Sequence, residues 1–182
     1  MRHLPNLICL FRLVLIWPIL VALHKGQHLA ALGLFIVAAV SDGLDGYLAK
    51  RFNWTSELGK ILDPVADKLL LITVFVEAAW LGLIPWWLTA AVVARDVMIG
   101  LGALVYRLWF GPVRGRPTVL SKINTALQLL YVMLVMLDAT AAVPPRELLD
   151  AAAAITLAST VLSGLHYVVS FTRRVWTPAR PA

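Results

Sequence analysis

Six long apolar segments, joined by short polar connections, constrain this chain more than any other feature of its sequence. They cover residues 7–23, 29–50, 58–81, 86–108, 118–137 and 147–171. A lipid bilayer has a hydrocarbon core of about 30 Å, which an α-helix crosses in about 20 residues. Inside lipid the backbone must satisfy its own hydrogen bonds, so apolar segments of this length are helical. We therefore expect an all-α integral membrane protein with six transmembrane helices, in which residues 1–182 form a single membrane-embedded domain.

The composition supports a membrane protein and argues against a disulfide-stabilised domain and a nucleic-acid-binding protein. The chain is 60% hydrophobic and 14% charged, with a mean hydropathy of +0.83. Its single cysteine, Cys9, excludes an intramolecular disulfide framework. The net charge of +6 would suit nucleic acid in a soluble chain, but in a membrane protein it reports orientation and contact with anionic lipids. We expect membrane lipids, and no nucleic acid, among its partners.

Lysine and arginine residues are distributed unevenly between the two ends of the predicted helices. Suppose that the N-terminus, residues 51–57, residues 109–117 and the C-terminus share one side of the membrane. That side and the adjoining helix ends then hold thirteen of the 16 Lys and Arg residues, whereas the other side holds Lys25 and Arg146. Positive residues concentrate on the cytoplasmic side. We therefore expect a multi-pass protein of the bacterial inner membrane, with both termini in the cytoplasm.

Four aspartates lie between the second and third apolar segments, at spacings of three, eighteen and four residues: Asp42, Asp45, Asp63 and Asp67. On helices, the first two share one face and the last two share another, separated along the axis by roughly 4.5 and 6 Å. A turn over residues 52–56 would bring all four carboxylates together on the cytoplasmic side. Carboxylates so close repel one another and need cations, and oxygen ligands suit Mg²⁺, Mn²⁺ or Ca²⁺ rather than Zn²⁺.

Each part of this stretch could also have a purely structural role. A single aspartate could cap a helix or pair with a neighbouring lysine, although four such residues on two helix faces make that explanation weak. Gly43, Gly46 and Gly59 could allow close helix packing, or could let a ligand phosphate approach the backbone. Two divalent cations with lysines around them would suit a pyrophosphate.

The pattern is Asp42-x2-Asp45-Gly46-x2-Ala49-Lys50-x8-Gly59-x3-Asp63-x3-Asp67. It resembles the signature of the CDP-alcohol phosphatidyltransferase family, DxxDGxxARx8GxxxDxxxD, at seven of its eight fixed positions. The departure is Lys50, which stands where the family has arginine. Lysine keeps the positive charge but loses the bidentate geometry of a guanidinium. Arg51 follows in sequence, although on a helix it points about 100° away.

The resemblance implies six membrane helices in a homodimer, with two divalent cations (Mg²⁺ or Mn²⁺) in a cavity on the cytoplasmic side. It also implies a catalytic domain that transfers a phosphatidyl group from CDP-diacylglycerol to an alcohol and releases CMP. By position, Asp42, Asp45 and Asp63 are similar to ligands of one cation. Asp42, Asp63 and Asp67 are similar to ligands of the other, and Asp67 to the general base. Positions that match nucleotide contacts are Asn6, Gly46, Ala49, Lys50 and Gly59.

The second half of the chain bears on the acceptor alcohol. Residues 95–98 and 117–128, together with His166 and Tyr167, resemble the eukaryote-type, CDP-diacylglycerol-dependent cardiolipin synthases. This implies phosphatidylglycerol as the acceptor. The alternative is a phosphatidylglycerophosphate synthase, which uses glycerol-3-phosphate. Arg95 and Lys122 are candidates to bind the acceptor's phosphate; Arg95 could instead pair with Asp96, and Lys122 could be a solvated interfacial residue.

A divalent-cation transporter is the competing class of function. Such a protein needs polar groups across the membrane midplane and an exit on the far side. Here the acidic cluster lies at one interface and the segments beyond it are almost wholly apolar. Glu77 lies ten residues after Asp67, roughly 15 Å along a helix, so we expect it outside the site. The sequence therefore favours the phosphatidyltransferase.

Overall fold

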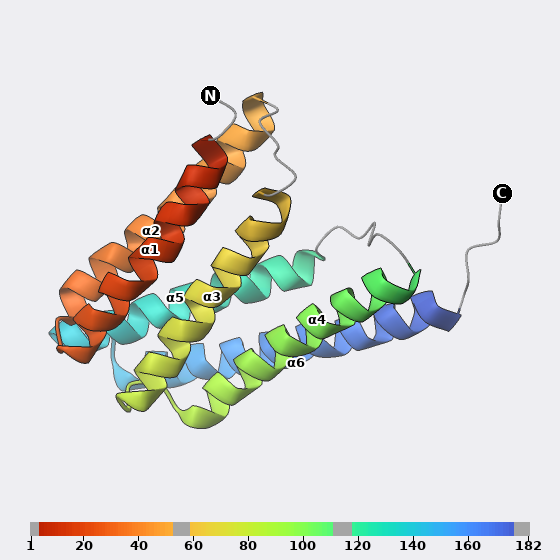
Figure 1. The fold of residues 1–182 in the computed structure, drawn as a ribbon. Helices are drawn as coiled ribbons and strands as arrows, with labels where there is room; N and C mark the ends of the chain where they lie inside the picture. Colours follow the sequence, from red (N-terminus) through yellow and green to blue (C-terminus); the bar gives the residue numbers. More distant parts are fainter. Residues whose placement is uncertain (1–3, 53–58, 111–117, 177–182) are drawn as a thin grey trace.

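Six α-helices make up the computed structural model, which describes residues 4–52, 59–110 and 118–176 (Figure 1). Their bounds are α1 (Leu4–His24), α2 (His28–Phe52), α3 (Gly59–Trp80), α4 (Trp86–Phe110), α5 (Val119–Ala141) and α6 (Arg146–Trp176). Within the described ranges every regular element is a helix, which confirms the all-α expectation. Each helix lies close to one of the predicted apolar segments. The predicted turn at residues 52–56 and the basic connection after α4 lie largely outside the described residues.

Three of the helices are long and apolar enough to cross a bilayer, judged over the described part of the chain. They are Trp86–Val105 in α4, Val119–Ala141 in α5 and Arg146–Thr172 in α6. Shorter apolar stretches occur in α1 at Cys9–His24 and in α2 at His28–Ser41. The helical architecture thus supports an integral membrane protein, whereas a full set of six spans stays a prediction.

Two tight turns set neighbouring helices side by side. Gly26 ends α1 and Gly82 ends α3, both in the left-handed region with φ of 70° and 76°. After α3, the N–H of Gly82 bonds to the carbonyl of Ala79 and that of Leu83 to Ala78, at 3.0 and 2.8 Å. These paired bonds satisfy the last carbonyls of the helix, and glycine adopts the required φ without a steric penalty. The short connections therefore follow directly from glycine placement.

The helices are packed in a defined order around these turns. α1 packs on α2 and α3, α4 packs on α6, and α5 contacts α2, α3 and α6. In Figure 1 the α1–α2 pair and the α4–α6 pair diverge, and α3 and α5 run between them. The contact between α3 and α4 joins the two parts. Residues on α3 therefore face two different partners, α1 on one side and α4 on the other.

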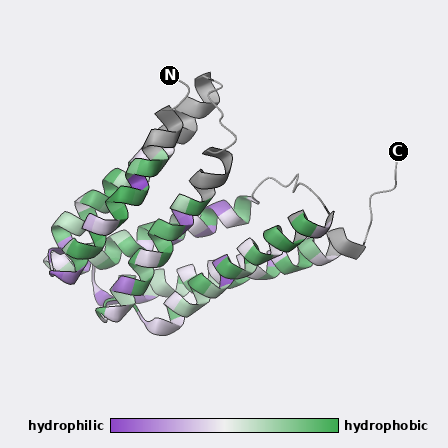
Figure 2. Cartoon of the chain, in the orientation of Figure 1, coloured by the Kyte–Doolittle hydropathy of each residue, from purple (hydrophilic) through white to green (hydrophobic). Residues whose placement is uncertain are grey.

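The apolar core occupies the part of the fold where the helices converge. Its fully buried members include Phe35 on α2, Phe75 on α3, Leu88 on α4 and Met136 on α5. Many other large apolar side chains face outward, such as Trp17, which is 74% exposed. Figure 2 shows that hydrophobic residues make up most of the length of the described helices, with hydrophilic residues near the turns and at a few points within helices. An outward apolar surface of this extent suits lipid rather than water.

Candidate functional site

Asp67 lies on α3 and is held by a cation from the first helix. Arg12 of α1 donates from Nη1 to Oδ1 of Asp67 in a close ion pair. The Arg12 side chain is fully buried, while that of Asp67 is 35% exposed. A buried guanidinium requires a charged partner, because removing it from water is otherwise unfavourable. The pair fixes the face of α3 that carries Asp67 against α1 and leaves part of the carboxylate accessible.

The other three aspartates of the motif lie on the helices predicted for them. Asp42 and Asp45 are in the second half of α2, and Asp63 is on α3, one turn before Asp67. Their side chains lie outside the described residues. Convergence of the four carboxylates therefore stays a prediction.

The residues predicted to contact the nucleotide also lie on helices, and their contacts likewise stay predictions. Asn6 is in α1, Gly46, Ala49 and Lys50 are in α2, and Gly59 is the first residue of α3. The side-chain surroundings of these positions lie outside the described residues.

Glu77 lies far from Asp67, as the spacing along α3 predicts. Its carboxylate Oε1 lies 3.0 Å from Nδ1 of His24 at the end of α1. Three helical turns separate Glu77 from Asp67 along α3. The observed partner gives Glu77 a role in joining α1 and α3 at the opposite end, outside the candidate site.

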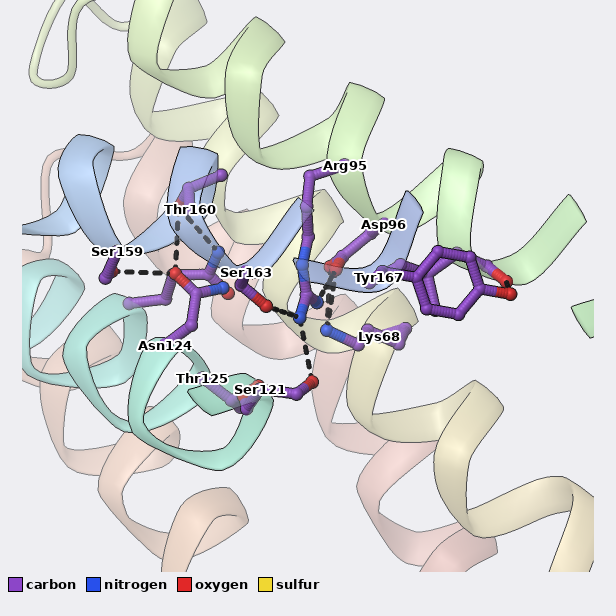
Figure 3. Close-up of polar contacts among 12 residues, drawn as sticks. Lys68, Arg95, Asp96, Ser121, Asn124, Thr125, Ser159, Thr160, Ser163 and Tyr167 are labelled. Carbon is purple, nitrogen blue, oxygen red and sulfur yellow. Dashed lines mark hydrogen bonds and ion pairs between the residues drawn. The ribbon is translucent and has the colours of Figure 1, made fainter. Parts of the chain in front are cut away.

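A second polar cluster lies where α3 meets α4, centred on Asp96. Lys68 of α3 donates from Nζ to both carboxylate oxygens of Asp96, at 2.8 and 2.9 Å. Arg95 donates from Nη1 to Oδ1 of the same carboxylate at 2.6 Å. Figure 3 shows the carboxylate between the two cations. The Asp96 side chain is 1% exposed, so its charge is balanced almost entirely by these two contacts.

The guanidinium of Arg95 is also bound by two hydroxyl groups from the last two helices. Nη2 donates to Oγ of Ser121 on α5 at 2.8 Å and to Oγ of Ser163 on α6 at 2.5 Å (Figure 3). Nε of Arg95 is buried and has no hydrogen-bond partner. The ion pair of Arg95 with Asp96, considered from the sequence as an alternative to ligand binding, is therefore present. It joins α3, α4, α5 and α6 at one point.

A polar seam between α5 and α6 supports the two serines. Oδ1 of Asn124 accepts hydrogen bonds from Ser159 at 2.8 Å and from Thr160 at 2.9 Å. Gln128, one turn further along α5, donates to Thr160 at 3.4 Å. Hydrogen bonds of this kind between apolar helices fix how the helices are rotated and shifted relative to each other. The seam thereby determines where Ser121 and Ser163 present their hydroxyl groups.

Lys122, the second residue predicted to bind an acceptor, lies apart from this cluster. It is exposed in the first turn of α5, where the Thr118 hydroxyl accepts from the backbone of Ser121 at 3.2 Å. Among the described residues, Lys122 has no hydrogen bond or ion pair to the Arg95 cluster. The structure brings Arg95 together with Asp96 and Lys68 instead.

Comparison with known proteins decides the family. Residues 2–170 match the CDP-alcohol phosphatidyltransferase family. The chain belongs to this family. Its members generally use divalent cations. The partly exposed carboxylate of Asp67 fits such use, since carboxylate oxygens are the ligands that Mg²⁺ and Mn²⁺ prefer.

Relatives of this chain carry different names. A probable phosphatidylglycerophosphate synthase of Mycobacterium tuberculosis is 31% identical over 182 residues, covering 95% of this chain and 83% of the relative. The human cardiolipin synthase (CMP-forming) is 34% identical over 145 residues, covering 71% and 48%. The CDP-diacylglycerol–glycerol-3-phosphate 3-phosphatidyltransferase of Bacillus subtilis is 31% identical over 196 residues, covering 92% and 94%. The chain thus spans about half the length of the human cardiolipin synthase, and sequence similarity leaves the acceptor open between the two names.

Sequence reasoning missed three residues of the clustered site. From the sequence, Lys68 is one of the neighbouring lysines with which an aspartate of the motif could pair, and Ser121 and Ser163 have no assigned role. One signal was present for Lys68, because a lysine directly after Asp67 must point to a different face of α3. For the two serines, only the packing of α5 and α6 against α4 reveals the contact.

Proposed function

We propose that this phosphatidyltransferase transfers a phosphatidyl group from CDP-diacylglycerol to phosphatidylglycerol, giving cardiolipin and CMP. The observation that carries the acceptor choice is the neutralisation of one cation by Asp96. Lys68, Arg95 and Asp96 together have a net charge of +1. A phosphodiester such as phosphatidylglycerol carries one negative charge, which this cluster balances. A phosphomonoester such as glycerol-3-phosphate carries close to two.

Asp67 is the proposed general base. The acceptor's primary hydroxyl attacks the phosphorus that bears the diacylglycerol, a new P–O bond forms, and the pyrophosphate P–O bond to CMP breaks. Asp67 accepts the hydroxyl proton as the oxygen attacks, which a partly exposed carboxylate on the site face of α3 is able to do. Arg12 orients this carboxylate through its ion pair.

The proposed cation ligands are the four aspartates of the motif: Asp42, Asp45, Asp63 and Asp67. Two divalent cations, when bound, neutralise the phosphoryl oxygens and the leaving CMP. The residues proposed to contact the nucleotide and its pyrophosphate are Asn6, Gly46, Ala49, Lys50 and Gly59. Arg95 is proposed to lie beside the acceptor's phosphate within the cluster centred on Asp96. Lys122, exposed to water beside Ser121, is proposed to meet the phosphate only at the aqueous edge, where solvent and salt screen its charge.

The proposed cellular setting is a homodimer in the bacterial inner membrane, with the site on the cytoplasmic side. The uneven distribution of Lys and Arg supports this orientation. Both substrates are lipids in the proposed reaction, so each would reach the site from within the bilayer.

The second candidate function is phosphatidylglycerophosphate synthesis from glycerol-3-phosphate. It is favoured by the Mycobacterium tuberculosis and Bacillus subtilis relatives, which align over more than nine-tenths of this chain. The chemistry at Asp67 would be the same, because both acceptors offer a primary hydroxyl. A divalent-cation transporter, considered from the sequence, has no support from the family to which the chain belongs.

The test uses purified protein in liposomes with CDP-diacylglycerol and Mg²⁺ or Mn²⁺. Phosphatidylglycerol and glycerol-3-phosphate are supplied separately, and the products are identified by mass. Cardiolipin with equal CMP release supports the proposal. Phosphatidylglycerophosphate without cardiolipin replaces it with the second candidate, and metal flux without CMP release refutes both.

A further inference from the structure

We propose that Lys68 is a substrate-binding residue, which with Arg95 forms a subsite for a phosphate ester, and that Asp96 sets the charge selectivity of this subsite. The inference rests on the proposed function in taking the phosphate ester to be that of the acceptor. It adds Lys68 and Asp96 to the residues that the sequence indicated.

Accessibility distinguishes the two cations that share Asp96. The Lys68 side chain is 35% exposed, whereas those of Arg95 and Asp96 are 4% and 1% exposed. Arg95 is bound by Asp96, Ser121 and Ser163, so a ligand cannot reach most of its donors without displacing a protein group. Lys68 has three N–H donors, and its hydrogen bonds in the described structure all go to Asp96. Lys68 is therefore the cation that an incoming phosphate can contact first.

The position of Lys68 along α3 relates the subsite to the proposed base. Asp67 and Lys68 are consecutive, so their side chains leave α3 about 100° apart. Asp67 faces α1, where Arg12 holds it, and Lys68 faces α4, where Asp96 holds it. If Lys68 binds the phosphate of a substrate, a hydroxyl group on the same head group would lie near the adjacent face of α3, which carries Asp67. This arrangement suits an acceptor that carries a phosphate and a nucleophilic hydroxyl in the same head group.

The neighbouring contacts make the subsite rigid. Ser121 and Ser163 hold the Arg95 guanidinium from two helices, and Arg95 in turn fixes Asp96 against Lys68 (Figure 3). The buried Nε of Arg95 adds a donor that has no protein partner. Asp96 thus acts as a positioning residue that keeps the Lys68 ammonium in place without substrate, and Arg95 contributes its charge to the subsite.

Charge balance gives the subsite its selectivity. Two cations and one carboxylate leave a single positive charge in surroundings of low polarity, where an uncompensated charge is unfavourable. A monoanionic phosphodiester neutralises it, whereas a dianionic phosphomonoester would leave a net negative charge. Asp96 therefore disfavours a soluble phosphomonoester acceptor by neutralising one cation that such an acceptor would need.

The phosphate at Lys68 could come from the acceptor or from the pyrophosphate of CDP-diacylglycerol. Lys68 faces α4 and away from α1, whereas the predicted nucleotide contacts lie on α1, α2 and the start of α3. The acceptor is therefore the favoured source. Separate kinetic constants for the two substrates distinguish these sources.

The first experiment compares Lys68→Gln with wild type, and Lys25→Gln serves as control. Lys25 is exposed in the turn after α1, so its replacement removes the same charge elsewhere. Loss of a hydrogen bond to a charged group corresponds to about a 10- to 100-fold effect. We expect the KM for phosphatidylglycerol to rise at least about 10-fold, with kcat and the KM for CDP-diacylglycerol nearly unchanged. A rise confined to CDP-diacylglycerol, or no rise in either KM, would overturn the assignment.

The second experiment measures the ratio of kcat/KM for phosphatidylglycerol to that for glycerol-3-phosphate. Because both values come from the same preparation, loss of folded protein cancels. We expect Asp96→Asn to shift this ratio toward glycerol-3-phosphate by about 10-fold or more, the scale of one added charge at a buried site. Asp150→Asn, an exposed carboxylate on α6, should leave the ratio unchanged. An unchanged ratio in Asp96→Asn would mean that Asp96 is only structural.

A double variant tests the charge argument, and Lys68→Gln of the first experiment keeps the inference falsifiable if Asp96→Asn fails to fold. Lys68→Gln combined with Asp96→Asn restores the net charge of +1 through Arg95 alone, so the ratio should return toward the wild-type value. A ratio that remains shifted contradicts the charge argument. Failure of the proposed function is visible separately, since wild-type protein would then form no cardiolipin. In that case the charge selectivity assigned to Asp96 is refuted as well, while Lys68→Gln should still raise the KM for glycerol-3-phosphate. An unchanged KM would overturn the role of Lys68 too.

Discussion

Arg12 and Asp67 are 55 residues apart in the chain, yet they form an ion pair between α1 and α3 in which the cation is fully buried. This pair determines which face of α3 is turned to α1. The next residue, Lys68, is bound to Asp96 of α4. Two consecutive residues therefore connect α3 to both parts of the fold, one through a carboxylate and one through an ammonium.

Replacing Arg12 by Met should lower both stability and activity. The variant leaves the Asp67 carboxylate without its buried partner. Because that carboxylate is 35% exposed, the loss should lie below the roughly 3–5 kcal/mol of a fully buried pair. Thermal unfolding in detergent measures the stability. His24→Gln is the matched control, because it alters an exposed hydrogen bond between the same two helices, for which about 0.5 kcal/mol is expected. Equal melting temperatures for the two variants would contradict a structural role for the Arg12–Asp67 pair.

Activity should require a divalent cation and the aspartates proposed to bind both ions. Asp42→Asn and Asp63→Asn each replace a carboxylate with a neutral amide, which holds Mg²⁺ or Mn²⁺ poorly. We expect both variants to be inactive while still folding as helical membrane proteins, as measured by CMP release and circular dichroism. Full activity of the wild type in excess chelator would contradict the two-cation hypothesis.

Asp67→Asn should separate chemistry from binding. The amide cannot accept the acceptor's proton, so turnover should fall by about 100-fold or more, the lower end of a general-base contribution. Binding of CDP-diacylglycerol, followed by titration of the purified variant, should persist. A variant that loses binding and retains turnover would show that Asp67 is not the base.

The helices could be predicted from the sequence because each coincides with an apolar segment long enough to need helical hydrogen bonds in lipid. Gly26 and Gly82 adopt the left-handed conformation after α1 and α3, and the prolines before α6 separate it from α5. The contacts between helices could not be predicted in the same way. Lys68 and Asp96 are 28 residues apart, and Arg95 and Ser163 are 68 apart, so only the packing of α3, α4 and α6 brings them together. Periodicity identifies an apolar face but not the helix against which it packs.

In the candidate site, too, the sequence motif could be predicted and the contacts between helices could not. The aspartate motif could be recognised because its spacing is fixed along two helices. The family match confirms the family that the motif resembles, whereas the roles of its residues stay predictions. For Arg95, the sequence left an ion pair with Asp96 and an acceptor phosphate as alternatives, and the structure shows the first. The position of Lys68 directly after Asp67 indicates that the two side chains leave α3 on different faces, but not that the face of Lys68 meets Asp96.

Replacing Lys50 by Arg should be tolerated or should improve apparent affinity for CDP-diacylglycerol. It restores the residue of the family signature, whose planar guanidinium binds pyrophosphate oxygens through two hydrogen bonds. The KM for CDP-diacylglycerol checks this, with Lys25→Arg as a control at an exposed turn. Severe inactivation would indicate that the surroundings of Lys50 are adapted to lysine.

Gly102→Ala should loosen the contact between α4 and α6, whereas Gly100→Ala should not. A Cβ at Gly102 would lie 2.6 Å from the hydroxyl oxygen of Tyr167 on α6, which donates to the carbonyl of Ile99 at 3.2 Å. Tyr167 must then move and give up this hydrogen bond, at a cost of about 1–3 kcal/mol for overpacking. A Cβ at Gly100 meets nothing within 4 Å, so the better helix propensity of alanine makes that change neutral or stabilising by up to about 1 kcal/mol.

Thermal unfolding of the two alanine variants checks this difference, since both add one methyl group to the same helix. We expect Gly102→Ala to melt below wild type and Gly100→Ala at or above it. Adding Tyr167→Phe to Gly102→Ala removes the nearest clashing atom and should recover part of the loss. Ring carbon Cε1 would still lie 2.9 Å from the new methyl, so recovery should be incomplete. Equal melting temperatures for Gly102→Ala and Gly100→Ala would mean that α4 and α6 are not packed as closely at Tyr167 as the structure has them.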